Sequence, residues 1–483
     1  MTEINAGAAG DTTSRHDRNA GHAAHIMAAE HRGLDGTMPR PVNVTMLGAG
    51  SMFTPELAKD LFAIPGNAGG ELRLVDIDRA RLEPMTLLMA RVVDQLGVAD
   101  RWTIRSTTER RDVLAGTDYI VNCIEVSGLE CVRHDNDIPA SFGVDQCIGD
   151  TIGPGGLFKG LRTIPVWLDV LRDAEELCPD ALVLNYTNPM SMMCLAATRA
   201  SSMQVVGLCH SVQATSRLLA RRAGVRYRDL DWDCAGINHL AWFTRLEHAG
   251  QNLYPDVIAK AERDLAGNPD DPDDAGDLVR KDMMVHFGAF ITESSGHLSE
   301  YLPYYRTRRD VIERYCDTGY DGESSFYANN WPTWRADADR NRAAMISGEL
   351  PLHTRRSWEY ASWIIEAREK DIAYSIHGNV ANRDGLISNL PHDGIVEVDC
   401  TIDGRGIAPN HHGALPPHMA AICASNMAMY DLAAQAAIER SREMAVHALM
   451  LDPLTAAMCT PGEIKAMTLA MFEAEAEFLD DYR

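Results

Sequence analysis

The feature that most constrains the fold of this chain is a strand, a glycine turn and a helix that begin near residue 42. Residues 42–47 (VNVTML) form an apolar, partly β-branched stretch typical of a buried strand. The stretch runs directly into GAGS at residues 48–51, and a helix-like segment follows over residues 55–62. A second strand over residues 71–75 ends in Asp76, which lies 26 positions after the second glycine. A parallel α/β sheet is therefore expected from this point onward.

The order of strand, glycine turn, helix, strand and acid predicts a dinucleotide-binding unit. Glycines let the backbone approach a pyrophosphate, the helix N-terminus offers free N–H groups, and the acid accepts hydrogen bonds from ribose hydroxyls. The third glycine of the usual fingerprint is missing, and Phe53 stands in its place. The residues expected to bind the cofactor are Gly48, Gly50, Ser51, Met52, Phe53, Asp76 and, from a later strand, Asn122.

The acid at the end of the second strand favours NAD over NADP. A 2′-phosphate would be repelled by Asp76. Arg79 and Arg81 lie close behind the acid and would favour the opposite choice. We take Asp76 as the stronger indication and predict NAD.

Three later apolar runs predict further strands, over residues 119–124, 181–186 and 204–209. Each run carries or leads into polar side chains near its end. Because ligands bind beyond the carboxyl ends of parallel strands, we expect these side chains to face one crevice. They are Asn122, Asn185, Asn188, Cys209 and His210.

The neighbours Cys209 and His210 permit three interpretations. They could be a metal ligand beside a proton donor, a Cys/His nucleophile couple, or two unrelated side chains. A third residue, His239, lies among apolar neighbours, as a hydrogen-bonded core histidine often does. Paired with Cys209 it becomes a candidate ligand, because a thiolate and a neutral imidazole suit a transition metal better than magnesium. Two protein ligands would leave positions open for substrate oxygens or water.

Composition limits the partners of the chain. Its 69 acidic and 45 basic side chains give a formal charge of -24, which disfavours nucleic acid and anionic membranes as partners. No apolar run approaches the ~18 residues that would span a bilayer, and no signal peptide is recognisable. The odd number of 11 cysteines lacks framework spacing, so reduced thiols and a cytoplasmic location are expected.

The length of 483 residues and a hydrophobic content of 46% predict two closely packed domains. We place a Rossmann-like NAD-binding domain at residues 41–212 and a substrate and oligomerisation domain at residues 213–483, with helical Ala, Met and Leu spacing after residue 419. Residues 1–40 are expected to be a disordered extension. The extension contains four histidines, His16, His22, His25 and His31. They are consistent with a flexible polar tail and also with a metal-binding tract.

Several motifs together resemble glycoside hydrolase family 4 over roughly residues 42–400. In chain order they are VNVTMLGAGSMFTPEL, GDTIGPGGLFKGLRTIPV, NYTNPM, GLCHSVQ, GINHLAWF, TESSGHLSEYLPYY and GNVANRDGLISNLP. The CHSV stretch is similar to the α-galactosidase and α-glucosidase branch, and Val212 with Gln213 makes it most similar to the α-galactosidases. Phosphoglycoside members carry Cys-Asn or Cys-Asp followed by proline instead.

This resemblance implies a lactate/malate dehydrogenase-like first domain, a mixed α+β second domain, and a homodimer or homotetramer. It implies hydrolysis of α-glycosides, most of all α-galactosides, with NAD and a divalent metal, usually Mn²⁺. In the family route NAD⁺ takes a hydride from C3, a base removes the acidified C2 proton, and the aglycone leaves by elimination before water adds.

The resemblance also implies site residues. Cys209 and His239 would be metal ligands, and Asn188 would contact substrate hydroxyls near the metal. His210 occupies the position of a proposed general acid and would serve as acid or only as a hydrogen-bond partner of the substrate. Tyr301 is our choice for the C2 base. Its alternatives are Tyr304, Tyr305, or a purely structural role for Tyr301 at a domain interface.

Two further residues are predicted to bind substrate with less specific support. Asp150 begins a turn-rich stretch near the expected nicotinamide and sugar, where a structural turn explains it equally well. Arg162, on the following helix, would either hold that turn or contact the substrate.

Other functions remain open. Within the family, the chain could be an α-glucosidase, an α-glucuronidase or an α-galacturonidase. Outside it, an NAD-dependent dehydrogenase of 2-hydroxy acids would share the nucleotide-binding half, but would need a catalytic His with an acid partner and an Arg for the carboxylate. A non-catalytic NAD sensor would need neither the metal ligands nor the base.

Overall fold

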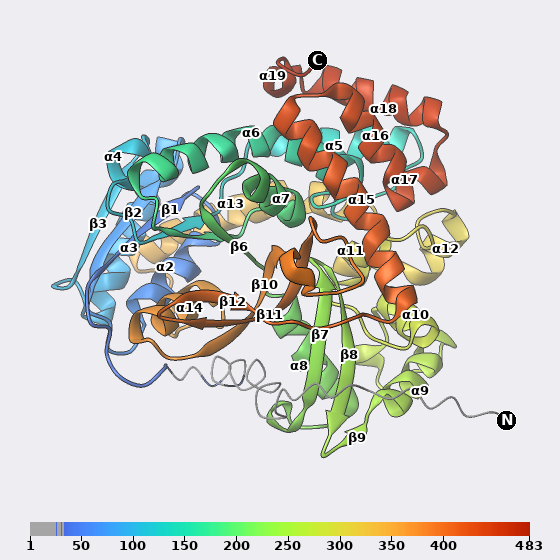
Figure 1. Ribbon diagram of the computed structural model, residues 1–483, viewed down its shortest axis with the longest axis horizontal. Helices are drawn as coiled ribbons and strands as arrows, with labels where there is room; N and C mark the ends of the chain where they lie inside the picture. The colour runs from blue at the N-terminus through green and yellow to red at the C-terminus, as the bar shows by residue number, and fades with distance from the viewer. Residues whose placement is uncertain (1–25, 27–29, 31–32) are drawn as a thin grey trace.

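The computed structural model describes residues 26, 30 and 33–483 of the chain. One sheet of 12 strands runs through the molecule, with the first strands at one side and the C-terminal helices gathered at the other (Figure 1). The strand order is β3-β2-β1-β4-β5-β6-β10-β11-β7-β8-β9, and β12 pairs with β11. None of the helices formed by these residues is long and apolar enough to cross a membrane.

The first six strands are parallel and have the order 3-2-1-4-5-6 of a dinucleotide-binding fold. They are β1 (Val42–Leu47), β2 (Gly70–Val75), β3 (Trp102–Thr107), β4 (Tyr119–Asn122), β5 (Leu182–Asn185) and β6 (Gln204–Leu208). The order reverses between β1 and β4, which lie side by side. The predicted Rossmann-type α/β fold is therefore confirmed.

Continuous runs of apolar residues explain why these strands form. Every residue of β4 and β5 is buried, as expected for strands covered by helices on both faces. The connecting helices have clear ends. In α3 (Arg79–Leu96) the Asp78 side chain accepts a hydrogen bond from the Ala80 N–H, and Gly97 ends the helix in the left-handed conformation.

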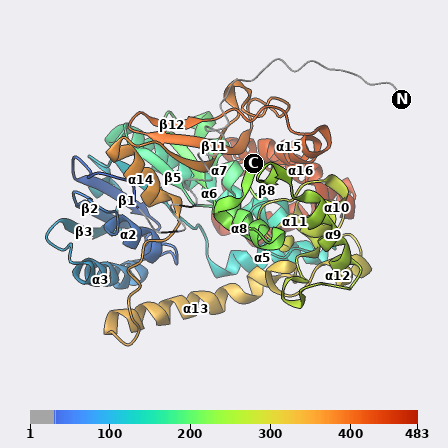
Figure 2. The same cartoon turned by 90° about the horizontal axis from the view of Figure 1, so that it is seen from below.

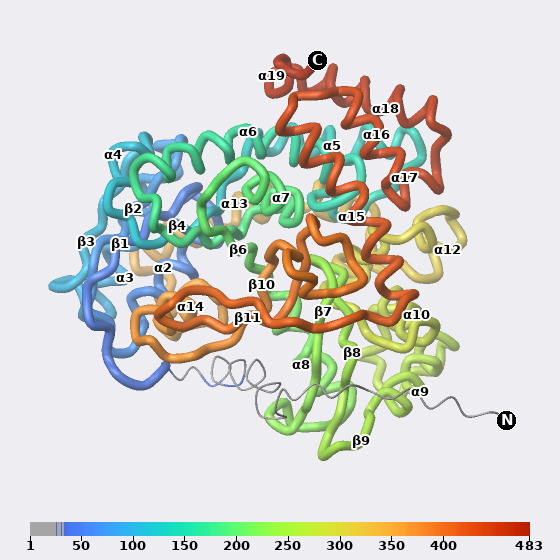
Figure 3. Tube along the Cα trace, in the orientation of Figure 1, coloured from blue at the N-terminus to red at the C-terminus, as the bar shows by residue number. Residues whose placement is uncertain are grey.

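The sheet continues past residue 212 with strands from the second half of the chain. Strand β10 (Tyr374–Ala381) pairs antiparallel with β6, and β11 (Ile395–Asp403) follows it. The hairpin of β7 (Asp231–Ile237) and β8 (Leu240–His248) extends the sheet further, as the trace in Figure 3 shows. The remaining strands are β9 (Gln251–Asn252) and β12 (Gly406–Pro409). The two predicted domains thus share one mixed sheet.

Helices of the second half complete the structure. The long α13 (Phe326–Ser347) packs on α3 and on α5 (Leu129–Ser141), and Figure 2 shows it running along one side of the molecule. The Met- and Ala-rich C-terminal region is helical, as predicted. Its elements are α15 (Pro417–Glu439), α16 (Arg442–Leu451), α17 (Pro453–Met458), α18 (Pro461–Ala474) and α19 (Ala476–Leu479).

Residues 33–40, which we predicted to belong to a disordered extension, are structured. Residues 33–40 pack against the domain, and Leu34 and Met38 are buried. The Leu34 N–H donates to the Glu366 carboxylate at 2.9 Å. Burial of these two apolar side chains explains why the segment is ordered rather than disordered. The four histidines of the extension lie outside the described residues.

Candidate active site

Most of the predicted site residues lie just beyond the carboxyl ends of the parallel strands, in the region that we call the crevice. Cys209 and His210 follow β6, Asn188 follows β5, and Asp150 precedes α6 (Gly153–Leu177). His239 lies in the two-residue turn between β7 and β8. The continuous sheet therefore brings residues from both halves of the chain to one place.

A cluster of metal-ligand side chains lies at the centre of the crevice. One ligand atom each from Cys209, His239 and Glu293 lies within 4.8 Å of the others. The His239 Nε2 atom is 3.6 Å from the Glu293 Oε2 atom. His239 and Glu293 both have left-handed backbones, with φ of 63° and 71°. Such conformations are unfavourable for these residue types and recur at functional sites.

Glu293 is the main residue that our sequence reasoning missed. Burial alone would raise its carboxyl pKa, but interactions with His239, His297 and more distant groups lower the pKa to about 2. The residue is therefore an anion at neutral pH and a third potential ligand. It lies in the TESSGH motif, which contributes to the family resemblance but has no ligand spacing of its own.

His297 and Asp150 extend the polar network away from the cluster. The His297 Nδ1 atom is 3.4 Å from the Glu293 carboxylate, and its Nε2 atom is 3.9 Å from the Asp150 carboxylate. The Asn188 amide donates to Asp150 at 3.3 Å. Burial would raise the Asp150 pKa, but Lys159, at 3.5 Å, and His297 lower it overall. Asp150 is thus a charged member of the crevice rather than a simple turn residue.

Tyr301 lies behind the cluster instead of open to it. Its side chain is fully buried, and its hydroxyl is 3.3 Å from the His239 Nδ1 atom. Burial, and then Tyr430, raises the Tyr301 pKa well above its ordinary value. The geometry suits orientation of the His239 ring better than proton abstraction. Of its predicted alternatives, Tyr305 donates to Asp282 and Tyr304 is partly exposed.

His210 has a different environment from the other crevice residues. Its side chain is 49% exposed, and its Nδ1 atom lies 3.7 Å from the carboxylate of Glu359. Burial raises the pKa of Glu359, and the charge of His210 opposes that rise. An accessible imidazole supported by a buried carboxyl group is an arrangement suited to proton donation.

The glycine turn after β1 has the form expected of a dinucleotide site. The Gly50 N–H donates to the Asp76 carboxylate at 2.7 Å, and the Arg81 guanidinium donates to the Gly50 carbonyl at 2.7 Å. A Cβ atom on Gly48 would lie 2.4 Å from the Cys123 carbonyl oxygen. Ser51, Met52 and the exposed Phe53 follow, and α2 (Thr54–Phe62) begins without a side-chain cap. In the first turn of α2, the Thr54 N–H donates to the Ser51 carbonyl and Pro55 has no N–H, so this turn can offer an anion only the Glu56 N–H.

Two predicted site residues have structural roles instead. Asn122 is fully buried and donates to the Asn185 side chain at 2.8 Å, so it holds two strand ends together rather than facing a ligand. Arg162 is enclosed between the carboxylates of Asp135 and Glu475, away from the crevice. Both terminal nitrogens of its guanidinium donate to these carboxylates, which corrects the predicted contact with substrate.

A further missed residue, Glu300, fastens the loop that carries Asp150. Its carboxylate accepts hydrogen bonds from the backbone N–H groups of Cys147, Ile148 and Gly149, at 2.5, 2.6 and 3.2 Å. Burial nonetheless raises its pKa to about 7. Glu300 adjoins Tyr301, so one short helix, α11 (Ser295–Glu300), supports both the loop and the cluster.

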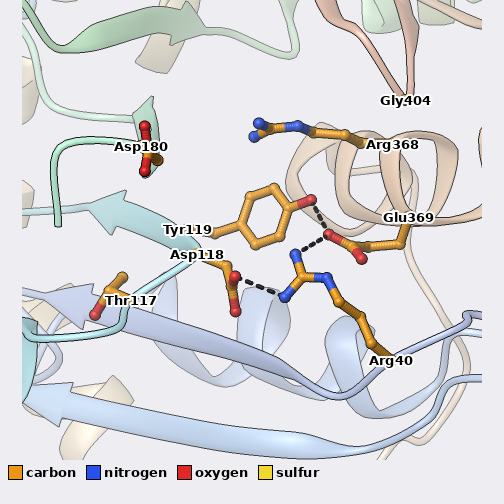
Figure 4. Close-up of a pocket in the computed structure, with 8 residues that line it drawn as sticks. All are labelled: Arg40, Thr117, Asp118, Tyr119, Asp180, Arg368, Glu369 and Gly404. Atoms are coloured by element: carbon orange, nitrogen blue, oxygen red, sulfur yellow. Dashed lines mark hydrogen bonds and ion pairs between the residues drawn. The ribbon is translucent and has the colours of Figure 1, made fainter.

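A surface pocket at the opposite end of the strands is unrelated to this crevice (Figure 4). Tyr119 begins β4, whereas the crevice residues follow strand ends. Within the pocket, Arg40 bridges Asp118 and Glu369, and the Tyr119 hydroxyl donates to Glu369 at 2.6 Å. These charges already satisfy one another.

The fold and the crevice together define a class of protein. A dinucleotide-type turn and a Cys, His and Glu cluster lie at the carboxyl edge of one sheet, which is the arrangement of a cofactor- and metal-assisted enzyme. Comparison with protein families makes the class specific. Residues 43–225 match the family 4 glycosyl hydrolase model, and residues 234–455 match the model of its C-terminal domain. The chain belongs to glycosyl hydrolase family 4, as predicted.

Two curated relatives agree with this assignment, and a solved structure shares the fold. The chain is 38% identical to an α-galactosidase of Rhizobium meliloti, over 91% of this chain and 89% of that protein. It is 35% identical to an α-galactosidase of Bacillus subtilis, over 91% and 99%. Among solved structures, a 6-phospho-α-glucosidase from gut microorganisms in complex with NAD and Mn²⁺ has a TM-score of 0.74 at 22% identity, over 91% and 99%.

Proposed function

We propose that this protein hydrolyses α-galactosides with the help of NAD and a divalent metal such as Mn²⁺. The observation that carries the proposal is the cluster of Cys209, His239 and Glu293 at the strand ends that also hold the glycine turn. The two α-galactosidase relatives, which the chain matches over nine tenths of its length, support the choice of sugar. We also expect a homodimer or homotetramer in the cytoplasm.

The residues at the site fit both the divalent metal and NAD. A thiol, an imidazole and a carboxylate offer sulfur, nitrogen and oxygen to a transition metal, and three ligands leave room for sugar oxygens. Gly48 and Gly50 leave space that a side chain would fill, and Asp76 stands at the end of β2 for a ribose. When bound, NAD⁺ would accept a hydride from the sugar and the metal would polarise its oxygens.

The chain's own residues would then bind and orient the sugar and move protons. Asn188 and Asp150 would hold sugar hydroxyls, since both are polar and face the crevice. His210 would donate a proton to the leaving oxygen, with Glu359 orienting its ring. Tyr301 would fix the His239 ring through its hydroxyl.

The proton at C2 needs a base more accessible than Tyr301. Tyr320 is about half-exposed, and the charges of Glu293 and Asp150 contribute to its raised pKa after burial itself. We therefore propose Tyr320 as the alternative to Tyr301 for this role. Either phenol would need the positive charge of a bound metal to act as a base near neutral pH.

The charges of the crevice favour a neutral sugar over a uronic acid. Lys159 is 3.2 Å from the Glu125 carboxylate and 3.5 Å from that of Asp150, so its charge is already matched. Glu293 adds another anion. The carboxylate of a glucuronide or galacturonide would meet these negative groups and be repelled.

Hydrolysis of an aryl α-galactoside tests the proposal. The protein should be stripped of metal and nucleotide and assayed with NAD⁺, Mn²⁺ and a thiol reductant, each added or omitted, beside the α-glucoside and α-glucuronide. We expect phenol release to need all three additions and to be fastest for galactose. Cleavage that ignores NAD⁺ and metal after stripping would refute the mechanism. Oxidation of a 2-hydroxy acid without glycoside cleavage would favour the dehydrogenase alternative.

A further inference from the structure

A second group of metal-ligand side chains lies outside the crevice, where the C-terminal helices meet α5. Cys131 and His134 belong to α5, and Glu475 lies between α18 and α19. One ligand atom from each of the three residues lies within 4.8 Å of the others. Cys131 and His134 are three positions apart, so a helix presents them on the same face.

Two atoms of this group are buried and lack partners. The Glu475 Oε1 atom and the His134 Nδ1 atom have no hydrogen-bond partner among the described residues. Glu475 as a whole is 1% exposed, so water does not readily satisfy its carboxylate. A buried polar atom without a partner costs free energy, and a bound cation would recover that cost at both atoms.

The charges around Glu475 are also unbalanced. Arg162 forms ion pairs with both Asp135 and Glu475, and all three side chains are buried. Two carboxylates therefore share one guanidinium, so both can be ionised together only when a second cation is present.

We propose that Cys131, His134 and Glu475 bind a divalent ion of the zinc type, separate from the metal of the crevice. Sulfur, nitrogen and oxygen donors suit Zn²⁺, and a water molecule that enters with the ion would complete a tetrahedral site. Binding would release two protons to solvent, one from the Cys131 thiol and one from the carboxyl groups that share Arg162, so the two positive charges of the ion replace those of the two protons. The Glu475 Oε1 atom is free to bind while Oε2 stays paired with Arg162.

Such an ion would have a structural effect. It would link α5 to the end of α18, on which α5 already packs, and would hold the C-terminal residues near α6. Because a metal that binds only the folded state stabilises it, thermal unfolding should report its presence.

The test uses the full-length protein in a Cys209→Ser background, which removes the thiolate of the crevice. After treatment with a chelator, the protein is titrated with Zn²⁺ and, separately, with Co²⁺. We expect about one tightly bound Zn²⁺, a higher melting temperature, and thiolate-to-cobalt charge-transfer absorption. Adding His134→Gln should weaken binding at least ~10-fold. Adding Cys131→Ser should abolish the absorption. His286→Gln, at an exposed histidine elsewhere, is the matched control.

Each result decides the question. If the Cys209→Ser protein binds no Zn²⁺ at micromolar concentration, the site does not exist. The same conclusion follows if His134→Gln binds as tightly as its background, or if the cobalt absorption survives Cys131→Ser. Because every comparison is made within the Cys209→Ser background, the result does not depend on the function proposed for the crevice.

Discussion

Glu293 is a charged residue at the centre of the polar contacts in the crevice. It lies beside His239 and His297, and its left-handed backbone turns the carboxylate toward them. A non-glycine residue in this conformation costs about 1–2 kcal/mol unless its surroundings hold it there. The two imidazoles supply that support in the free protein, and a metal would supply it in the active one.

Replacing Glu293 should therefore weaken metal binding more than it weakens the fold. We expect Glu293→Gln to lower activity on the aryl α-galactoside ~100-fold and to raise the Mn²⁺ concentration for half-maximal activity ~10-fold or more. Glu313→Gln, at an exposed glutamate, should behave as wild type. A variant that keeps the wild-type Mn²⁺ dependence would show that Glu293 is not a ligand.

Removing the hydroxyl group of Tyr301 or of Tyr320 should affect different kinetic parameters. If Tyr301 only orients His239, Tyr301→Phe should raise the Mn²⁺ requirement ~10-fold while kcat at saturating Mn²⁺ changes little. Tyr320→Phe should lower kcat at least ~100-fold at any Mn²⁺ concentration, because general-base catalysis contributes at least that much. Exchange of the C2 proton with deuterated water separates the two roles. Loss of exchange in Tyr301→Phe alone would restore Tyr301 as the base.

Sequence reasoning found residues whose chemistry is local and missed those defined by distant contacts. Cys209 and His239 were identified from their types and from the strand ends beside them. Glu293 has no spacing relation to either, and only the fold brings it within reach. Arg162 was predicted to contact substrate because no spacing pattern links it to its two partners, Asp135, 27 positions earlier, and Glu475, 313 positions later.

At the scale of single elements, the glycine turn after β1 determines whether a dinucleotide can bind. A Cβ atom on Gly50 would lie 2.8 Å from the Asp76 carboxylate and 2.7 Å from the Arg81 side chain. Gly50→Ala should thus displace the acid expected to bind the ribose. We expect NAD⁺ affinity, measured by calorimetry, to fall ~10-fold or more. Gly462→Ala, where a Cβ meets nothing within 4 Å, is the control and should leave affinity unchanged.

The start of α6 shows where prediction of elements was incomplete. Its glycines and proline were interpreted as a turn-rich stretch, yet the helix already begins at Gly153. Pro154 fits there because the first turn of a helix needs no N–H donor from it. Gly155 and Gly156 allow close packing, since a Cβ on either would lie within 2.4 Å of a backbone atom of the preceding loop.

At the scale of the whole molecule, buried acids should make stability depend on pH. Burial raises the pKa of Asp399 and Asp452 to about 6, of Glu300 to about 7, and of Glu397 to about 8. Each acid is protonated in the folded state at a pH where the unfolded chain has lost the proton. Their stabilising contribution is complete below pH ~4 and is lost as the pH rises through 6 to 8.

Urea unfolding of the metal-free protein at pH 5.5 and 8.5 measures this effect. We expect the free energy of unfolding to be lower at pH 8.5, and Asp399→Asn to reduce the difference by ~0.8 kcal/mol. Asp100→Asn, at an exposed aspartate, should leave the difference unchanged. Equal stability at both pH values in the wild type would contradict the raised pKa values.

The pairing of β10 with β6 also has a consequence for synthesis on the ribosome. The N-terminal half emerges first, and β6 then stays an open sheet edge until the segment around Tyr374–Ala381 has been made. An unpaired edge invites association with other chains. Nascent chains stalled between residues 225 and 370 should therefore depend on chaperones, although they already contain the complete glycine turn and Cys209.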